Sequence, residues 1–172
     1  RKFEALGLKW ADLDFTTSTV TIKRSIREIT VTQADGTRKT TTVEGDPKTN
    51  SSRRTLVLTQ PVLEVLMRHR NRIENPRRLE PDAWVFSSPS GNVQRPGNLA
   101  RSFNRLLEKN QLRRIRIHDI RHTALLLAIE TGIPIEAVSQ GAGHSRLDTT
   151  KSIYAPYSQT LADTFSQDLS RS

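Results

Sequence analysis

The spacing of apolar residues changes once along this chain, close to Pro61, and this change constrains the fold more than any other feature. Before Pro61, apolar and polar residues alternate, as in Thr19–Ile22, which is typical of strands with one buried face. After Pro61, apolar residues recur every three or four positions, which is typical of amphipathic helices. We therefore expect an α+β fold that is mainly helical, with a small antiparallel sheet near the N-terminus.

Three strands are expected in that sheet. The first begins at Thr19, and its alternation continues through Ile26, Ile29 and Val31. Asp35-Gly36 favours a tight hairpin turn, which is followed by a returning strand over residues 37–43. A third strand is predicted over residues 54–58, which would place Lys48 on the connection between the second and third strands.

The predicted helices begin at the start of the chain. Residues 1–9 show helical spacing, and because no capping residue precedes them we interpret the chain as a fragment of a longer protein. Two later helices carry apolar stripes that we expect in the core: Val62, Leu63, Leu66, Met67 and Ile73 on one, and Leu99, Phe103, Leu106 and Leu107 on the other.

The last part of the chain is also expected to be helical. A helix over residues 117–131 should end at Gly132, and Pro134 should open a shorter one that carries Ile135 and Val138. Thr149 or Thr150 could cap a helix that contains Tyr154. A final amphipathic segment is marked by Leu161, Phe165 and Leu169.

The composition narrows the function. The chain has 27 Lys and Arg residues against 18 acidic ones, and its net charge of +9 favours a polyanionic partner such as nucleic acid, although a membrane surface is an alternative. No apolar run approaches the roughly 18 residues of a spanning helix and no signal-like segment is seen, so we expect a cytosolic protein. The absence of cysteine excludes disulfides, a thiol nucleophile and thiolate metal ligands. One domain is expected in 172 residues.

The stretch from His118 to His122 is the richest in reactive side chains. His118 and Arg121 are three residues apart, so on a helix they project from the same side and could grip one phosphate, for which the planar fork of Arg is well suited. Taken alone, the pair fits a basic helix surface better. His118 and His122 are four residues apart, but Asp119 stands where the metalloprotease motif needs Glu, so we expect no metal there.

Two other places could hold reactive groups. Gly143-His144 is expected between short helices, where the glycine allows close backbone approach and the histidine could face a ligand, although Gly143 could simply end a helix. The chain has two tyrosines, Tyr154 and Tyr157, so a tyrosine nucleophile has few candidates, and most tyrosines are packing residues.

Five motifs, in this order, resemble the catalytic domain of tyrosine recombinases (phage integrases). They are Arg1-x-x-Glu4 with Leu6-Gly7-Leu8-Lys9-Trp10, Pro47-Lys48-Thr49, His118-x-x-Arg121-His122, Gly143-His144, and Tyr154 ten residues after His144. The resemblance extends from Arg1 to about Tyr157. The sequence departs from the family at Phe3, where a small residue is usual, and at Ala142, where Leu is frequent.

The resemblance implies a role for each matched residue. Arg1 and Arg121 would bind the non-bridging phosphate oxygens, and His144 would add a hydrogen bond. Tyr154 would be the nucleophile, with His118 as its base, and Lys48 would protonate the departing 5′ oxygen. Tyr157 falls outside the register. No cofactor is implied, and no metal either, since the cationic side chains would supply its charge.

The implied function is a site-specific recombinase or integrase from a prophage or other mobile element, acting on double-stranded DNA in the bacterial cytoplasm. The whole chain, residues 1–172, would be the catalytic domain, with the family's core-binding domain outside it. It would assemble as a homo-oligomer on DNA, either with the C-terminal stripe docked on a neighbouring protomer or with that stripe folded onto its own domain. The alternatives are a topoisomerase with the same tyrosine chemistry, which the Gly-His-to-Tyr spacing disfavours, and a non-catalytic DNA-binding module.

Overall fold

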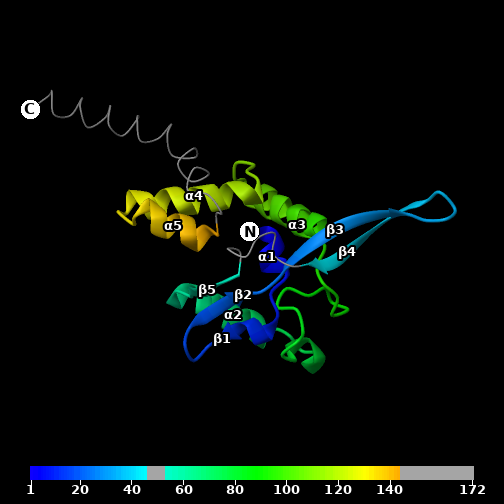
Figure 1. Ribbon diagram of the computed structural model, residues 1–172, viewed down its shortest axis with the longest axis horizontal. Coiled ribbons are helices and arrows are strands. Elements are labelled where there is room, and N and C mark those ends of the chain that lie inside the picture. The colour runs from blue at the N-terminus through cyan, green and yellow to red at the C-terminus, as the bar shows by residue number, and fades with distance from the viewer. Residues whose placement is uncertain (46–52, 144–172) are drawn as a thin grey trace, which may run out of the picture. The chain divides into compact units, whose positions relative to one another are not determined.

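The computed structural model describes residues 1–45 and 53–143 (Figure 1). Contacts within the chain cluster into two compact units, Arg1–His118 and Asp119–Ser172. No helix among the described residues is long and apolar enough to cross a membrane. Outside the described residues lie Lys48, His144, Tyr154 and Tyr157, together with the predicted cap at Thr149 or Thr150 and the stripe of Leu161, Phe165 and Leu169.

Two small antiparallel sheets belong to the first unit (Figure 1). One has the strand order β1-β2-β5, formed by β1 (Leu13–Asp14), β2 (Thr19–Ile22) and β5 (Arg54–Val57). The other is a hairpin of β3 (Ser25–Thr32) and β4 (Arg38–Gly45). Its turn contains Gly36 at a φ of +80°, and the Asp35 carboxylate accepts the Thr37 N–H at 2.9 Å. The α+β class and the hairpin turn are confirmed.

The strand pairing differs from the expected one. One three-stranded sheet was expected, but the long first strand is interrupted at Lys23 and Arg24, so β2 and β3 belong to different sheets, and β5 pairs with β2. The short β1 was not expected. Lys23 and Arg24 both form ion pairs with the buried carboxylate of Asp12. Consecutive side chains of a regular strand point to opposite faces, so two neighbouring residues that reach one carboxylate depart from strand geometry. Alternation of apolar residues identifies a strand but does not select its partner.

The core of this unit gathers around Trp10, Leu66, Ile73 and Val85. Trp10 lies in η1 (Trp10–Asp12), and its indole N–H donates to the Arg78 carbonyl at 2.8 Å. Leu66 comes from α2 (Gln60–Asn71), which has Pro61 in its first turn. Two members of the stripe expected on α2, Val62 and Met67, are exposed, because they lie beside the narrower buried stripe of Leu63 and Leu66.

The remaining helices of the first unit also depart in part from the prediction. α1 (Lys2–Leu6) ends at Gly7, so the expected helix over residues 1–9 is shorter, and the Leu8 carbonyl instead accepts the Val85 N–H at 2.9 Å. The short η3 (Pro76–Leu79) precedes α3 (Pro96–Lys109). On α3, Leu107 is buried and Leu99 and Phe103 are half-buried, but Leu106 is exposed.

The helices of the last part agree with the sequence. α4 (Ile117–Glu130) is followed by Gly132 at a φ of +87°, and the Gly132 N–H donates to the Ile129 carbonyl at 2.8 Å. α5 (Ile135–Ala142) begins after Pro134 and ends at Gly143, whose φ of +67° is in the left-handed region. Val138 and Ala142 are the buried apolar residues of α5.

Candidate functional site

The predicted His-x-x-Arg pair lies in the first turns of α4. His118 is exposed and Arg121 is half-buried. Their three-residue spacing on a continuous helix puts both side chains on the same side, as predicted. An exposed imidazole beside a partly buried guanidinium is a suitable pair for binding a phosphate, because both groups can donate hydrogen bonds and the guanidinium stays charged at neutral pH.

Arg121 also connects this helix to α5. Its Nη2 donates to the Ala142 carbonyl at 2.5 Å. The last carbonyls of a helix have no partner within the helix, so this bond satisfies one of them and restricts the guanidinium. Gly143 then ends α5 in the left-handed conformation immediately before His144. Arg121 of the His118-x-x-Arg121 motif is thus bonded to the residue that precedes the Gly143-His144 motif.

Arg1 is held by a buried carboxylate. Its Nη1 donates to Glu4 Oε1 at 2.8 Å, and Arg54 Nη2 donates to Glu4 Oε2 at 2.9 Å. The Glu4 side chain is only 5% exposed, against 33% for Arg1. Two guanidiniums therefore share one buried carboxylate, and the Arg1 side chain remains accessible while its orientation is restricted.

The charge state of Glu4 follows from these contacts. Burial alone would raise the pKa of Glu4, but the hydrogen bond from Arg54, the positive charges around it and the hydrogen bond from Arg1 together hold that pKa below its ordinary value. Glu4 is therefore ionised at neutral pH, as the two guanidiniums require.

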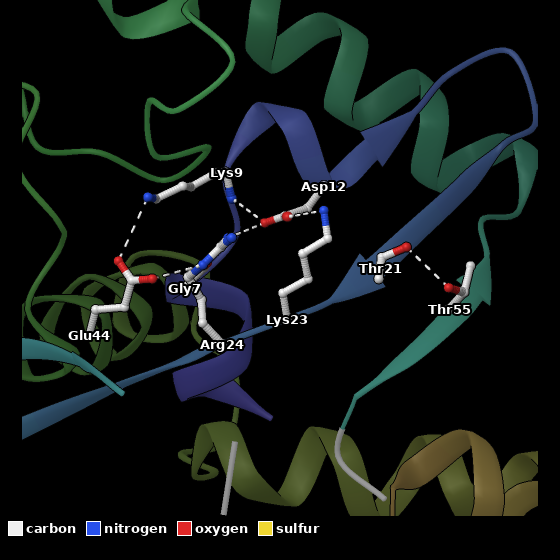
Figure 2. Close-up of polar contacts among 8 residues, drawn as sticks. All are labelled: Gly7, Lys9, Asp12, Thr21, Lys23, Arg24, Glu44 and Thr55. Carbon is white, nitrogen blue, oxygen red and sulfur yellow. Dashed lines mark hydrogen bonds and ion pairs between the residues drawn. The ribbon is translucent and has the colours of Figure 1, made fainter. Parts of the chain in front are cut away.

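A second ionic network lies at the point where β2 and β3 separate (Figure 2). The Asp12 side chain is 1% exposed, and its Oδ2 accepts the Lys9 N–H at 2.9 Å and also binds Arg24. Lys23 Nζ lies 3.3 Å from Asp12 Oδ1. Arg24 continues to the end of β4, where its Nε lies 3.0 Å from Glu44 Oε1.

The two networks hold the described chain on either side of residues 46–52. Glu44, on one side, is joined to Arg24, and Arg54, on the other, is joined to Glu4. The hydroxyls of Thr21 and Thr55 lie 3.0 Å apart and link β2 to β5 next to Arg54 (Figure 2). Both flanks of the segment that carries Lys48 are therefore attached to the unit that contains Arg1.

The structure brings together only part of the predicted site. It places His118 and Arg121 on one helix, and Arg1 in the first unit beside Glu4. Lys48, His144 and Tyr154 lie outside the described residues, so their roles stay predictions. Among the described residues, no group of three His, Asp or Glu side chains could hold a metal ion.

Sequence reasoning assigned no role to the buried acids and their partners. Glu4 was noted only as part of a motif, and Asp12, Arg24 and Arg54 were not singled out. A signal was present for Glu4, which lies between the apolar residues Phe3 and Leu6 in a helical segment, since a buried carboxylate needs a cation. For Arg54, alternation along β5 places it on the same half-buried face as Leu56.

Comparisons with known proteins show the family of the chain. The sequence model of the phage integrase family matches residues 1–160. A tyrosine recombinase XerC-like protein of Caldanaerobacter subterraneus subsp. tengcongensis is 32% identical over 163 residues, covering 90% of this chain and 41% of that protein. The chain belongs to the phage integrase family.

Solved structures show the same fold. The Tn1549 transposon integrase in complex with transposon right end DNA has a TM-score of 0.74 at 21% identity, covering 99% of this chain and 55% of that one. The XerA recombinase has a TM-score of 0.68 at 17% identity, covering 98% of this chain and 51% of that one. The chain thus spans about half of the length of these relatives.

Proposed function

We propose that this chain is the catalytic domain of a site-specific DNA recombinase or integrase that cleaves and rejoins DNA through a 3′-phosphotyrosyl intermediate. The observation that carries the proposal is the hydrogen bond from Arg121 to the Ala142 carbonyl, because it joins the arginine of one predicted motif to the residue that precedes the next, Gly143-His144. Family membership and the buried Glu4 that orients Arg1 support the same function. The net charge of +9 is suited to a DNA substrate.

The proposed reaction is a transesterification at one phosphodiester. The Tyr154 hydroxyl attacks phosphorus, its proton passes to His118, and the bond from phosphorus to the 5′ oxygen breaks. Lys48 gives a proton to that oxygen, which leaves as a 5′ hydroxyl. Arg1, Arg121 and His144 bind the non-bridging oxygens, where negative charge increases in the transition state. Rejoining reverses these steps with the 5′ hydroxyl of the same or another strand, so no ATP is needed.

The test is covalent capture on DNA. The protein is incubated with a randomised library of nicked duplexes, in which cleavage next to the nick releases a short fragment and prevents rejoining. Covalent protein–DNA adducts are then recovered under denaturing conditions and sequenced. Wild-type protein should form adducts, and Tyr154→Phe should abolish them while leaving duplex binding nearly unchanged, because one hydroxyl adds little to an interface dominated by phosphates.

Tyr157→Phe is the matched control and should keep the adduct. If Tyr157→Phe loses the adduct and Tyr154→Phe keeps it, the nucleophile is wrongly assigned. Wild-type protein that binds duplex without any adduct would support a non-catalytic DNA-binding module. Relaxation of supercoiled plasmid by a monomer, without strand exchange, would support the topoisomerase.

The proposed partners are double-stranded DNA and further copies of the same protein. The Tn1549 integrase, whose fold this chain shares, was solved bound to transposon DNA. We place the protein on DNA in the bacterial cytoplasm, as a homo-oligomer in which Leu161, Phe165 and Leu169 of one protomer dock on the next. Phe165→Asp should then weaken association on the captured duplex, measured by sedimentation. A large loss of thermal stability in the monomer would show instead that the stripe packs on its own domain.

A further inference from the structure

A basic hollow lies at the junction of the two sheets of the first unit. It has a volume of about 450 Å³ and is lined by Lys23, Arg24, Glu44, Gly45 and Arg53. Three of the five lining residues are cationic and one is anionic. The hollow is therefore suited to an anionic ligand, provided that the carboxylates around it are already neutralised by other groups.

The nearby carboxylates are neutralised. Glu44 lies 3.0 Å from Arg24 Nε and 3.7 Å from Lys9 Nζ, and Asp12 is bound by Arg24 and by the Lys9 N–H. Among the described residues of this network, Lys9, Lys23 and Arg24 are three cations against the two carboxylates of Asp12 and Glu44, so one positive charge is left over beside the hollow.

Lys23 is the group best able to meet a ligand. Its side chain is 48% exposed, whereas the Arg24 side chain is 16% exposed and already binds Asp12, Glu44 and the Gly7 carbonyl (Figure 2). The ammonium of Lys23 lies 3.3 Å from Asp12 Oδ1 and has three N–H donors, so it can contact the carboxylate and an anion together. Arg24 is held in the wall of the hollow by its three partners, and Lys23 supplies the more exposed cation.

We propose that this hollow binds one backbone phosphate of the DNA, a contact separate from the residues that hold the cleaved phosphate; the inference rests on the proposed function. A point charge such as an ammonium binds phosphate without reading a base.

The test is a scan of phosphate neutralisation. The scan uses the captured duplex or, where no adduct forms, a duplex selected by binding from the same library. Each of its phosphates is replaced in turn by an uncharged methylphosphonate, and binding to wild-type protein and to Lys23→Gln is measured. Replacement of one particular phosphate should weaken binding by wild-type protein about tenfold. The same replacement should leave the affinity of Lys23→Gln almost unchanged. The slope of log K against log salt concentration should also be smaller by about 0.9 in this variant, the value for one phosphate contact.

Three further variants make the result specific. Binding by Arg53→Gln should no longer be weakened by neutralising that phosphate. Binding by Lys23→Arg should still be weakened by it, as in wild-type protein. Lys39→Gln removes the same charge from the exposed part of β4 and should leave the sensitive phosphate unchanged. An identical scan for wild-type, Lys23→Gln and Arg53→Gln would overturn the proposal.

The source of the phosphate is tested separately, and so is the proposed function. Inorganic phosphate that binds wild-type protein below about 1 mM, is lost in Lys23→Gln and has no counterpart in the DNA scan would show a site for free phosphate and overturn the inference. We call a phosphate coupled when its neutralisation weakens binding by wild-type protein but not by Lys23→Gln. Adduct formation without any coupled phosphate overturns only the inference. A coupled phosphate without adduct formation keeps the DNA contact and overturns only the catalytic function.

Discussion

Buried carboxylates orient the cationic side chains of this chain. Glu4 and Asp12 are 5% and 1% exposed, and each is contacted by more than one cationic residue. A carboxylate buried in this way stays ionised because its cationic partners compensate for the hydration that it has lost. The same contacts restrict the orientation of those cationic side chains. At the scale of single residues, the acids therefore decide where the guanidiniums point.

The first prediction concerns Glu4 and pH. The folded pKa of Glu4 is lowered, so its contribution to stability is present above the unfolded value of about 4.3 and is lost as pH falls through the folded pKa. At pH 7, Glu4→Gln should lower the free energy of unfolding by about 1–3 kcal/mol, since two guanidiniums lose a charged acceptor. Urea unfolding should show this difference shrinking as pH falls from 5 toward 3. Glu28→Gln, on the exposed part of β3, should have no such effect; a pH-independent loss would contradict the assignment.

The second prediction concerns Arg121. Arg121→Ala should slow adduct formation by about 10²–10³, the usual cost of losing one donor to transition-state charge. Arg121→Lys should recover little, because an ammonium lacks the planar fork that can donate to the Ala142 carbonyl and, as proposed, to a phosphate at the same time. Single-turnover cleavage of the captured duplex measures both, and Arg114→Ala, an exposed residue ahead of α4, is the control. Full activity of the Lys variant would show that only positive charge matters there.

The hairpin of β3 and β4 shows how one element can be divided between core and surface. Ile26, at its base, is 1% exposed, whereas Ile29 and Val31, further along the same strand, are 41% and 51% exposed. The base contacts α1, and every β3 residue from Arg27 onward is exposed. The base is therefore part of the domain's core, while the outer part is available for other contacts.

The third prediction compares two isoleucines on that strand. Ile26→Ala should destabilise the protein by about 2–4 kcal/mol, because it leaves a cavity in a packed site. Ile29→Ala removes the same atoms from an exposed position and should cost less than about 1 kcal/mol. Chemical denaturation of both variants measures the difference. Equal losses would mean that the outer hairpin is packed as tightly as its base.

At the scale of the whole molecule, the chain has more lysine and arginine than acidic side chains, which suits it to a phosphate-rich ligand. The chain carries a net charge of +9, and the described residues contain no cluster of acids and histidines suited to a metal. In the proposed mechanism, Arg1, Arg121 and Lys48 balance the charge of the reacting phosphate.

The fourth prediction follows from that charge distribution. Adduct formation on the captured duplex should be the same with and without EDTA after dialysis against chelator. Added Mg²⁺ should change it only through the general effect of salt on DNA binding. Cleavage that stops with EDTA and returns with Mg²⁺ would favour a metal-dependent nuclease and would contradict the phosphotyrosyl mechanism.

The sequence by itself determined the local structure and the order of the motifs. Periodicity, turn residues and caps act over a few positions, so the hairpin at Gly36, the end of α4 before Gly132 and the start of α5 after Pro134 could be predicted. Spacing on one helix likewise paired His118 with Arg121.

Only the tertiary structure decided which distant residues meet. In the structure β5 pairs with β2, Glu4 binds Arg54 across 50 residues of sequence, and Arg121 binds the Ala142 carbonyl. The sequence patterns of these segments do not indicate which partner each will contact. Alternation gives a strand its faces and leaves its edges open to several neighbours. A charge can be buried only where other segments bring cations to it, and that is why the orienting role of Glu4 and Asp12 emerged from the fold.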